Sequence, residues 1–195
     1  MTELLDRIEK FRFLGREYLL WIWTESELFE TDLRPTGADP CAMWFETRMT
    51  LAFDDDETLV KCAAPAQAAE SKEALRRGKL PKEARIRLHR GGMEHAFTLK
   101  ADTLALTGVS LPTELMKKED DVHEVLYERM RLLEALEAIL EALFRDFLHL
   151  RLSEAWEKEI VPLFGRWAHG ESVDEKRYLA VKQRVLKKKP KAAAE

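Results

Sequence analysis

Seven basic side chains are concentrated in one short part of the sequence. Between residues 76 and 90 the one acidic residue is Glu83. A second basic stretch, residues 176–191, contains no acid. Because the whole chain has a formal net charge of -4, the rest of the sequence must be strongly acidic. This distribution predicts a polarised surface, one side of which attracts polyanions.

Arginine and lysine in such stretches can neutralise the phosphates of a nucleic acid without reading its bases. We therefore predict sequence-independent binding of double-stranded DNA. The predicted DNA-binding residues are Arg76, Arg77, Lys79, Lys82, Arg85, Arg87, Arg90, Lys187, Lys188 and Lys189. Two alternatives stay open: the first stretch is the solvated outer face of a strand, and the second is a solubilising tail.

A metal-dependent nuclease is the less favoured interpretation. Residues 54–56 are three aspartates, and together with Glu70 and Lys72 they resemble the carboxylates and lysine that position Mg²⁺ against a phosphate. Such an acid and lysine should occupy adjoining positions of a strand, whereas Glu70 and Lys72 fall inside a predicted helix. We expect a solvated turn and an exposed helix face instead.

Other catalytic patterns are weak as well. Asp146 and His149 are three residues apart, but no second carboxylate and histidine pair accompanies them, which favours a surface or capping role. The sequence has no glycine-rich phosphate loop and no recognisable serine or cysteine nucleophile. The expectation is a protein that is not an enzyme and that uses no metal or cofactor.

Four aromatic residues lie close together, and exposed aromatics can stack nucleobases. Trp21, Trp23, Trp44 and Phe45 have mainly apolar neighbours rather than basic ones. We therefore expect them to pack in the core.

Targeting signals are not evident. The first residues lack the basic and apolar pattern of a secretory signal, and no apolar run is long enough to cross a bilayer. A cytoplasmic protein without membrane contact is expected, in which Cys41 and Cys62 are reduced and buried.

The first part of the chain mixes helical and strand patterns. Apolar spacing predicts a helix over residues 4–28, interrupted near Gly15, whose later half is buried on every side. Residues 31–40 should form a loop. Period-two alternation predicts strands at 42–53 and 58–63, followed by a helix over 66–77 that Gly78 ends.

The second part is expected to start with a hairpin and to end in helices. Gly91 and Gly92 should form a tight turn between strands 85–90 and 93–100, with Arg85, Arg87 and His89 on one face. The further predicted elements are a strand at 103–109, a long helix at 122–151, a helix from Ser153 to Trp167 that Pro162 kinks or splits, and a basic helix at 171–186.

This order predicts an α+β fold with an antiparallel sheet of hairpins, a long C-terminal helix and further helices packed on it. Residues 1–170 should form a single domain. Residues 171–195 should form a basic tail that is partly helical and partly disordered.

Four segments resemble the recombination-associated RdgC family. They are residues 14–23 (LGREYLLWIW), residues 75–79 leading into 84–88 (LRRGK, ARIRL), residues 102–108 (DTLALTG), and residues 127–130 (YERM) with the long helix to Ser153. The match runs from about Phe11 to Trp167 and corresponds to the later half of that family's chain.

The resemblance implies a nucleoid-associated protein that binds duplex DNA, restrains a recombinase and forms a homodimer around DNA. It brings no catalytic residues with it. By position, the matching basic residues are Arg76, Arg77, Lys79, Arg85 and Arg87.

A different class of function is kept as an alternative. The acidic remainder of the chain and the long helix could form a protein-interaction module that acts on recombination enzymes. Leu126 to Leu150 follow heptad-like steps that could pair between subunits, although burial against the chain's own sheet is favoured.

Overall fold

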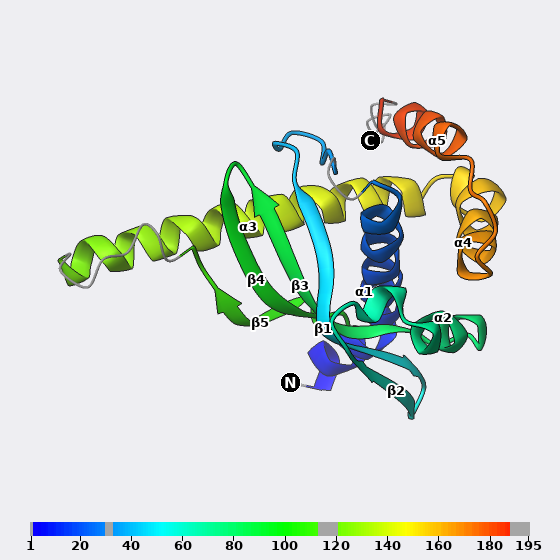
Figure 1. Cartoon of the computed structure of the whole chain (residues 1–195), viewed down its shortest axis with the longest axis horizontal. Helices are drawn as coiled ribbons and strands as arrows, with labels where there is room; N and C mark the ends of the chain where they lie inside the picture. Colours follow the sequence, from blue (N-terminus) through cyan, green and yellow to red (C-terminus); the bar gives the residue numbers. More distant parts are fainter. Residues whose placement is uncertain (1, 30–32, 113–120, 188–195) are drawn as a thin grey trace.

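The computed structural model describes residues 2–29, 33–112 and 121–187, with side chains from residue 13 onward. It contains a five-stranded antiparallel sheet in the order β2-β1-β3-β4-β5. The strands are β1 (Ala42–Phe53), β2 (Asp56–Lys61), β3 (Leu80–Arg90), β4 (Met93–Lys100) and β5 (Ala105–Ser110). Together with its helices, the sheet confirms the predicted α+β class (Figure 1).

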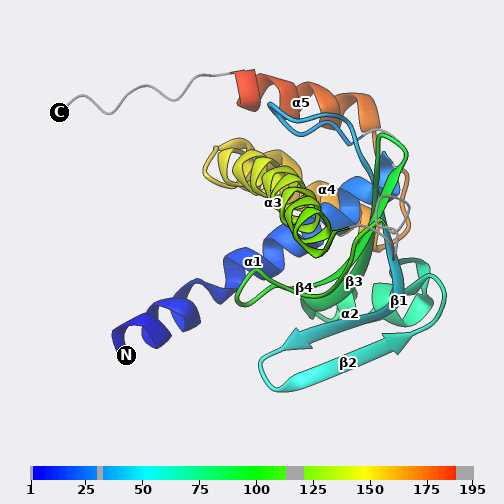
Figure 2. The ribbon, with the colours of Figure 1, turned by 90° about the vertical axis from the view of Figure 1, so that its left-hand side faces the viewer.

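Two long helices lie on the same face of this sheet, as both ribbon views show (Figures 1 and 2). They are α1 (Thr2–Leu28) and α3 (Val122–Arg151). Shorter helices follow at α2 (Ala69–Arg76), α4 (Val161–Ala168) and α5 (Glu175–Lys187). The long helix at 122–151 is confirmed with its predicted bounds, and Asp121 caps it by accepting a hydrogen bond from the His123 backbone N–H.

The core lies between the sheet and these helices. Ala84, Ile86 and Leu88 of β3 are fully buried, whereas the alternating Arg85 and Arg87 are only partly covered. This alternation confirms the strand predicted at 85–90 and gives the sheet one apolar face, although β3 begins five residues earlier than predicted, at Leu80. Gly91 and Gly92 form the predicted turn with positive φ values of 55° and 81°.

The predicted interruption of the first helix at Gly15 is wrong, because α1 runs unbroken from Thr2 to Leu28. Gly15 has a different role. A Cβ built on it would lie 1.8 Å from the carbonyl oxygen of Ala101, so α1 can pass this close to the end of β4 only without a side chain there. The later half of the helix is buried all round, as predicted.

Several boundaries differ from the predicted ones. β2 begins and ends two residues earlier, and α2 begins at Ala69 because a 3₁₀ turn, η1 (Pro65–Gln67), precedes it. The predicted split near Pro162 is confirmed: a π-helical turn, η3 (Trp156–Ile160), gives way to α4, in whose first turn Pro162 lies.

Three further predictions concern exposed or terminal parts. Cys41 is buried, and burial raises the pKa of its thiol to about 11, but Cys62 is exposed, so its predicted burial is wrong. Both cysteines are free. The predicted disordered end, residues 188–195, lies outside the described residues. None of the described helices has the length and apolar character needed to cross a membrane.

Candidate interaction surfaces

The seven predicted bases between residues 76 and 90 do not form an unopposed positive ribbon. Each one has a carboxylate partner. None of these partners is Glu83, the one acid within the basic stretch itself. Arg76 and Arg77 pair with Glu73, Lys79 with Asp56, Lys82 with Glu57, Arg85 and Arg87 with Glu46, Arg87 also with Glu94, and Arg90 with Asp39. The premise of a concentrated positive stripe is therefore wrong.

The geometry on β3 shows how tightly these bases are engaged. The Nη2 atom of Arg87 is 2.8 Å from Glu46, and its Nη1 atom is 3.2 Å from Glu94. The hydrogen bond to Glu46 raises the pKa of Arg87. Arg85 donates to the carbonyl oxygen of Gly108 at 2.6 Å. Lys79 is buried, which removes it from contact with a phosphate. The alternative of a solvated, internally paired strand face fits this arrangement better.

Basic side chains without a carboxylate partner lie at the other predicted site. On α5, Lys176, Arg177 and Lys187 are exposed, and none of the described carboxylates forms an ion pair with them. The other two bases of this helix are occupied: Lys182 by Glu25 and Arg184 by Glu159. Lys188 and Lys189 lie outside the described residues.

The first turns of α3 expose an apolar row. Val122 is 79% exposed, Leu126 56%, Tyr127 75% and Met130 53%. Figure 1 shows this part of the helix projecting beyond the strands of the sheet. From Leu132 onward the apolar face of the same helix is buried. The heptad-like row is thus divided, since its second half packs in the chain's own core, as favoured from the sequence, and its first half does not.

Most segments that resemble the RdgC family hold the fold together. Arg16 forms a two-point ion pair with Asp102, and Glu17 binds Arg151 at 2.6 Å. These contacts join α1 to the turn after β4 and to the end of α3. The 127–130 segment differs, because Tyr127 and Met130 are largely exposed and make no comparable contact within the described core.

Two carboxylates of α1 organise the helices, the buried Glu25 and the partly buried Glu27, and sequence reasoning missed both. Glu25 accepts hydrogen bonds from Tyr178 and, at 2.7 Å, from Lys182. Burial raises the pKa of Tyr178 well above its usual value, and Trp21 Nε1 donates to its hydroxyl oxygen at 2.9 Å. Because Tyr178 and Lys182 belong to α5, this network attaches α5 to α1.

Glu27 forms the second centre. It accepts from Trp23 Nε1 at 2.7 Å, from Trp167 Nε1 at 3.1 Å and from Lys72 Nζ at 2.8 Å. Desolvation lowers the pKa of Lys72, which packs between the two indole rings. The available signal was the position of Glu25 and Glu27 directly after the run from Tyr18 to Trp23, which is apolar on every side of the helix.

The weak catalytic candidates are explained by structure. Lys72 is engaged by Glu27 and not by Glu70, which lies exposed on α2. Asp146 is 1% exposed and accepts a hydrogen bond from the Thr36 backbone N–H at 2.9 Å. The predicted surface or capping role is therefore wrong for Asp146, which lies within α3 and joins it to the turn at Thr36. Within the described ranges, no three His, Cys, Asp or Glu side chains come together as metal ligands.

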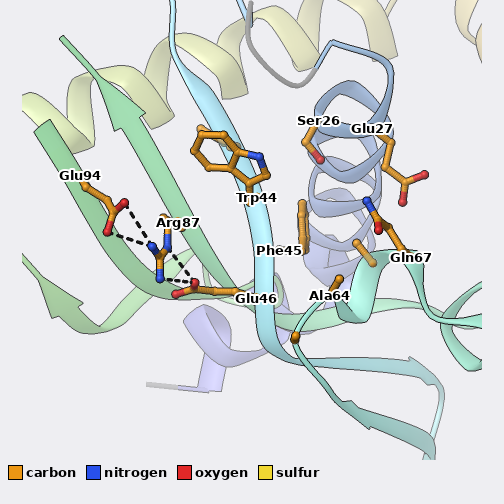
Figure 3. A pocket seen from close by; sticks show the side chains of 12 residues that line it. Ser26, Glu27, Trp44, Phe45, Glu46, Ala64, Gln67, Arg87 and Glu94 are labelled. Atoms are coloured by element: carbon orange, nitrogen blue, oxygen red, sulfur yellow. Dashed lines mark hydrogen bonds and ion pairs between the residues drawn. The ribbon is translucent and has the colours of Figure 1, made fainter. Parts of the chain in front are cut away.

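Three of the four clustered aromatics are in the core: Trp21, Trp23 and Phe45 are at most 5% exposed. Trp44 is 38% exposed and lies beside a hollow of about 420 Å³ (Figure 3). The prediction of core packing is thus wrong for Trp44. Carboxylates around the hollow would repel phosphates, so the ring does not suit nucleobase stacking.

Comparison of the chain with protein-family models, with curated proteins and with solved structures finds no match. The resemblance to the RdgC family therefore stays a prediction from the residues.

Proposed function

We propose that this chain is an interaction module that pairs with a second copy of itself through the first turns of α3. The exposure of Val122, Leu126, Tyr127 and Met130 on one projecting helical segment carries the proposal. Contiguous exposed apolar side chains of this kind mark interaction sites on folded proteins.

The arrangement of charges along the segment supports a second copy as the partner. Acids come first, at Glu124 and Glu128, and bases follow at Arg129 and Arg131. An antiparallel pair about a two-fold axis near residue 128 brings Leu126 of one copy against Met130 of the other. The same pairing places Glu124 of each helix near Arg131 of its neighbour, while Glu128 lies on the axis.

Light scattering after size exclusion tests this proposal. The wild-type chain should elute with twice its mass of 22.7 kDa, and the double variant Leu126→Glu with Met130→Glu should elute as a monomer. Leu59→Glu is a matched control, because Leu59 on β2 is 52% exposed but lies away from α3, and it should remain a dimer. A monomeric wild-type chain at its highest soluble concentration would contradict the proposal.

Duplex DNA binding is the second candidate, supported by the bases of α5 that have no ion-pair partner. Lys176, Arg177 and Lys187 are positioned to contact phosphates without first breaking an ion pair. The resemblance to the RdgC family favours the same ligand. Pairing through α3 would join two such helices in one particle, which strengthens binding to a long polyanion through effective concentration.

Gel-shift titrations across salt concentrations distinguish α5 from the hairpin. Replacing Lys176, Arg177 and Lys187 by Gln should weaken binding and lower the salt slope by roughly 0.9 for each lost phosphate contact. Replacing Arg85 and Arg87 by Gln is the control and should change little, because both are already engaged by Glu46. If the Arg85 and Arg87 variant lost affinity and the α5 variant did not, the DNA site would lie on the β3–β4 hairpin. If no salt-dependent gel shift were seen at all, duplex DNA binding would be ruled out.

A further inference from the structure

Four of the five tryptophans share one arrangement, which consists of a cation over the ring and a carboxylate paired with that cation. Lys182 lies 5.2 Å from the centre of the Trp21 ring and binds Glu25. Lys72 lies 3.2 Å from the Trp167 ring and 4.9 Å from the Trp23 ring, and it binds Glu27.

The fourth tryptophan follows the same rule. The guanidinium carbon of Arg151 is 5.5 Å from the Trp156 ring, and Arg151 pairs with Glu17 and Glu157. All these distances fall within the range at which a cation is attracted to an indole face. The four tryptophans are at most 7% exposed, so these contacts are internal.

Trp44 differs in both respects. It is 38% exposed, and none of the described cations lies over its ring. It faces the hollow of about 420 Å³ between β1, the end of α1 and η1. The hollow is lined by three carboxylates, those of Glu27, Glu46 and Glu94, and by a single guanidinium, that of Arg87.

Figure 3 shows how these groups are arranged. Arg87 of β3 lies between Glu46 and Glu94. Trp44 lies next to Arg87, because the two residues are cross-strand partners on β1 and β3. Arg87 is therefore held by the carboxylates rather than stacked on the indole. Glu27 is already paired with Lys72, and Glu46 with Arg85 and Arg87, whereas Glu94 is half-exposed and only shares Arg87 with Glu46. The accessible carboxylate of Glu94 and the exposed indole face are the two elements that the other tryptophans present to a cation.

We propose that the Trp44 hollow binds a lysine or arginine side chain presented by a partner polypeptide. The cationic end would lie over the indole face and share the carboxylates of Glu46 and Glu94. Exposed aromatic rings beside carboxylates favour such groups, because the ring quadrupole and the negative charge attract the same cation. The site is separate from the α3 row and does not depend on self-association.

The probe is the peptide acetyl-(Gly-Arg)₄-amide, titrated into ¹⁵N-labelled protein while the five indole N–H signals are followed. The Trp44 signal should shift, and the signals of the four buried tryptophans should not. The neutral peptide acetyl-(Gly-Gln)₄-amide should leave the Trp44 signal unchanged. A response from Trp44 to both peptides, or to neither, would overturn the proposal.

Variants separate a specific site from general attraction to an acidic protein. Trp44→Leu keeps an apolar side chain without the indole face and should weaken peptide binding about tenfold. Glu94→Gln should weaken it as well, without removing a core residue. Phe53→Leu is the matched control, since Phe53 is an exposed aromatic on the same strand, and its affinity should be unchanged. Equal affinity of Trp44→Leu and wild type, with both folded by circular dichroism, would refute the site.

Discussion

The guanidinium of Arg16 meets the carboxylate of Asp102 through two parallel hydrogen bonds, from Nε to Oδ1 at 2.7 Å and from Nη2 to Oδ2 at 3.0 Å. This fork joins α1 to the turn between β4 and β5. The Arg16 side chain is 9% exposed, so the pair is shielded from solvent more than an ordinary surface pair. The hydrogen bond to Asp102 also raises the pKa of Arg16.

Arg16→Lys should lower the free energy of unfolding by about 1–2 kcal/mol, because lysine keeps the charge but cannot make the two-point contact. Urea denaturation followed by circular dichroism measures the change. Arg77→Lys is the control: its pair with Glu73 is exposed and should be worth less than about 0.5 kcal/mol. Equal losses of unfolding free energy in the two variants would show that the two-point contact of Arg16 stabilises the protein no more than an exposed ion pair does.

Gly15→Ala should destabilise the protein by about 3 kcal/mol or more, because the new methyl group would overlap the carbonyl oxygen of Ala101. Gly165→Ala provides the comparison. Gly165 lies within α4 with no atom near an added Cβ, so alanine should stabilise by about 0.5–1 kcal/mol through its helix propensity. In thermal melts, Gly15→Ala should lower the Tm and Gly165→Ala should raise it. An unchanged Tm for Gly15→Ala would contradict the close approach of Ala101 to α1.

Tyr178→Phe should lower the free energy of unfolding by about 1–3 kcal/mol, because the buried Trp21 N–H and one Glu25 oxygen lose their partner. Hydrogen exchange read by mass spectrometry should show faster exchange in α5 than in β3. Uniform acceleration across the chain would instead show that α5 unfolds together with the rest.

His95 should make stability depend on pH near neutrality. It is 4% exposed, and neither ring nitrogen has a hydrogen-bond partner in the described part of the chain. Burial lowers its pKa from the ordinary value of 6.5, and the charge of Arg90 adds to this effect. The folded state therefore keeps the ring neutral at a pH where the unfolded chain already takes up a proton.

Because the unfolded state binds more protons in that window, stability should fall as the pH is lowered through about 6.5 toward the folded pKa. Urea titrations at about pH 7.5 and pH 5.5 measure the difference. His95→Leu should reduce it, whereas His89→Gln, an exposed position on β3, should not. An unchanged pH dependence in His95→Leu would assign the effect to other groups.

Local patterns in the sequence were sufficient for most of the fold. The alternation on β3, the Gly91 and Gly92 turn and the spacing of Leu136, Leu143 and Leu150 are properties of neighbouring residues, so they predicted elements correctly. The prediction for Gly15 was wrong because the reason for a glycine there lies outside the helix. The carbonyl of Ala101, far along the chain, approaches α1 at this position and leaves no room for a side chain.

The charges show what only the tertiary structure decided. Arg85, Arg87 and Arg90 form a basic run in the sequence, but the fold brings Glu46 and Asp39 beside them from another part of the chain. An ion pair depends on distance in space rather than on sequence separation, so the sequence specified which charges exist and folding decided which are neutralised. The same reason explains why Trp44 is exposed while Trp21 and Trp23 are not: neighbours from distant segments cover those two rings and leave Trp44 at the edge of a hollow.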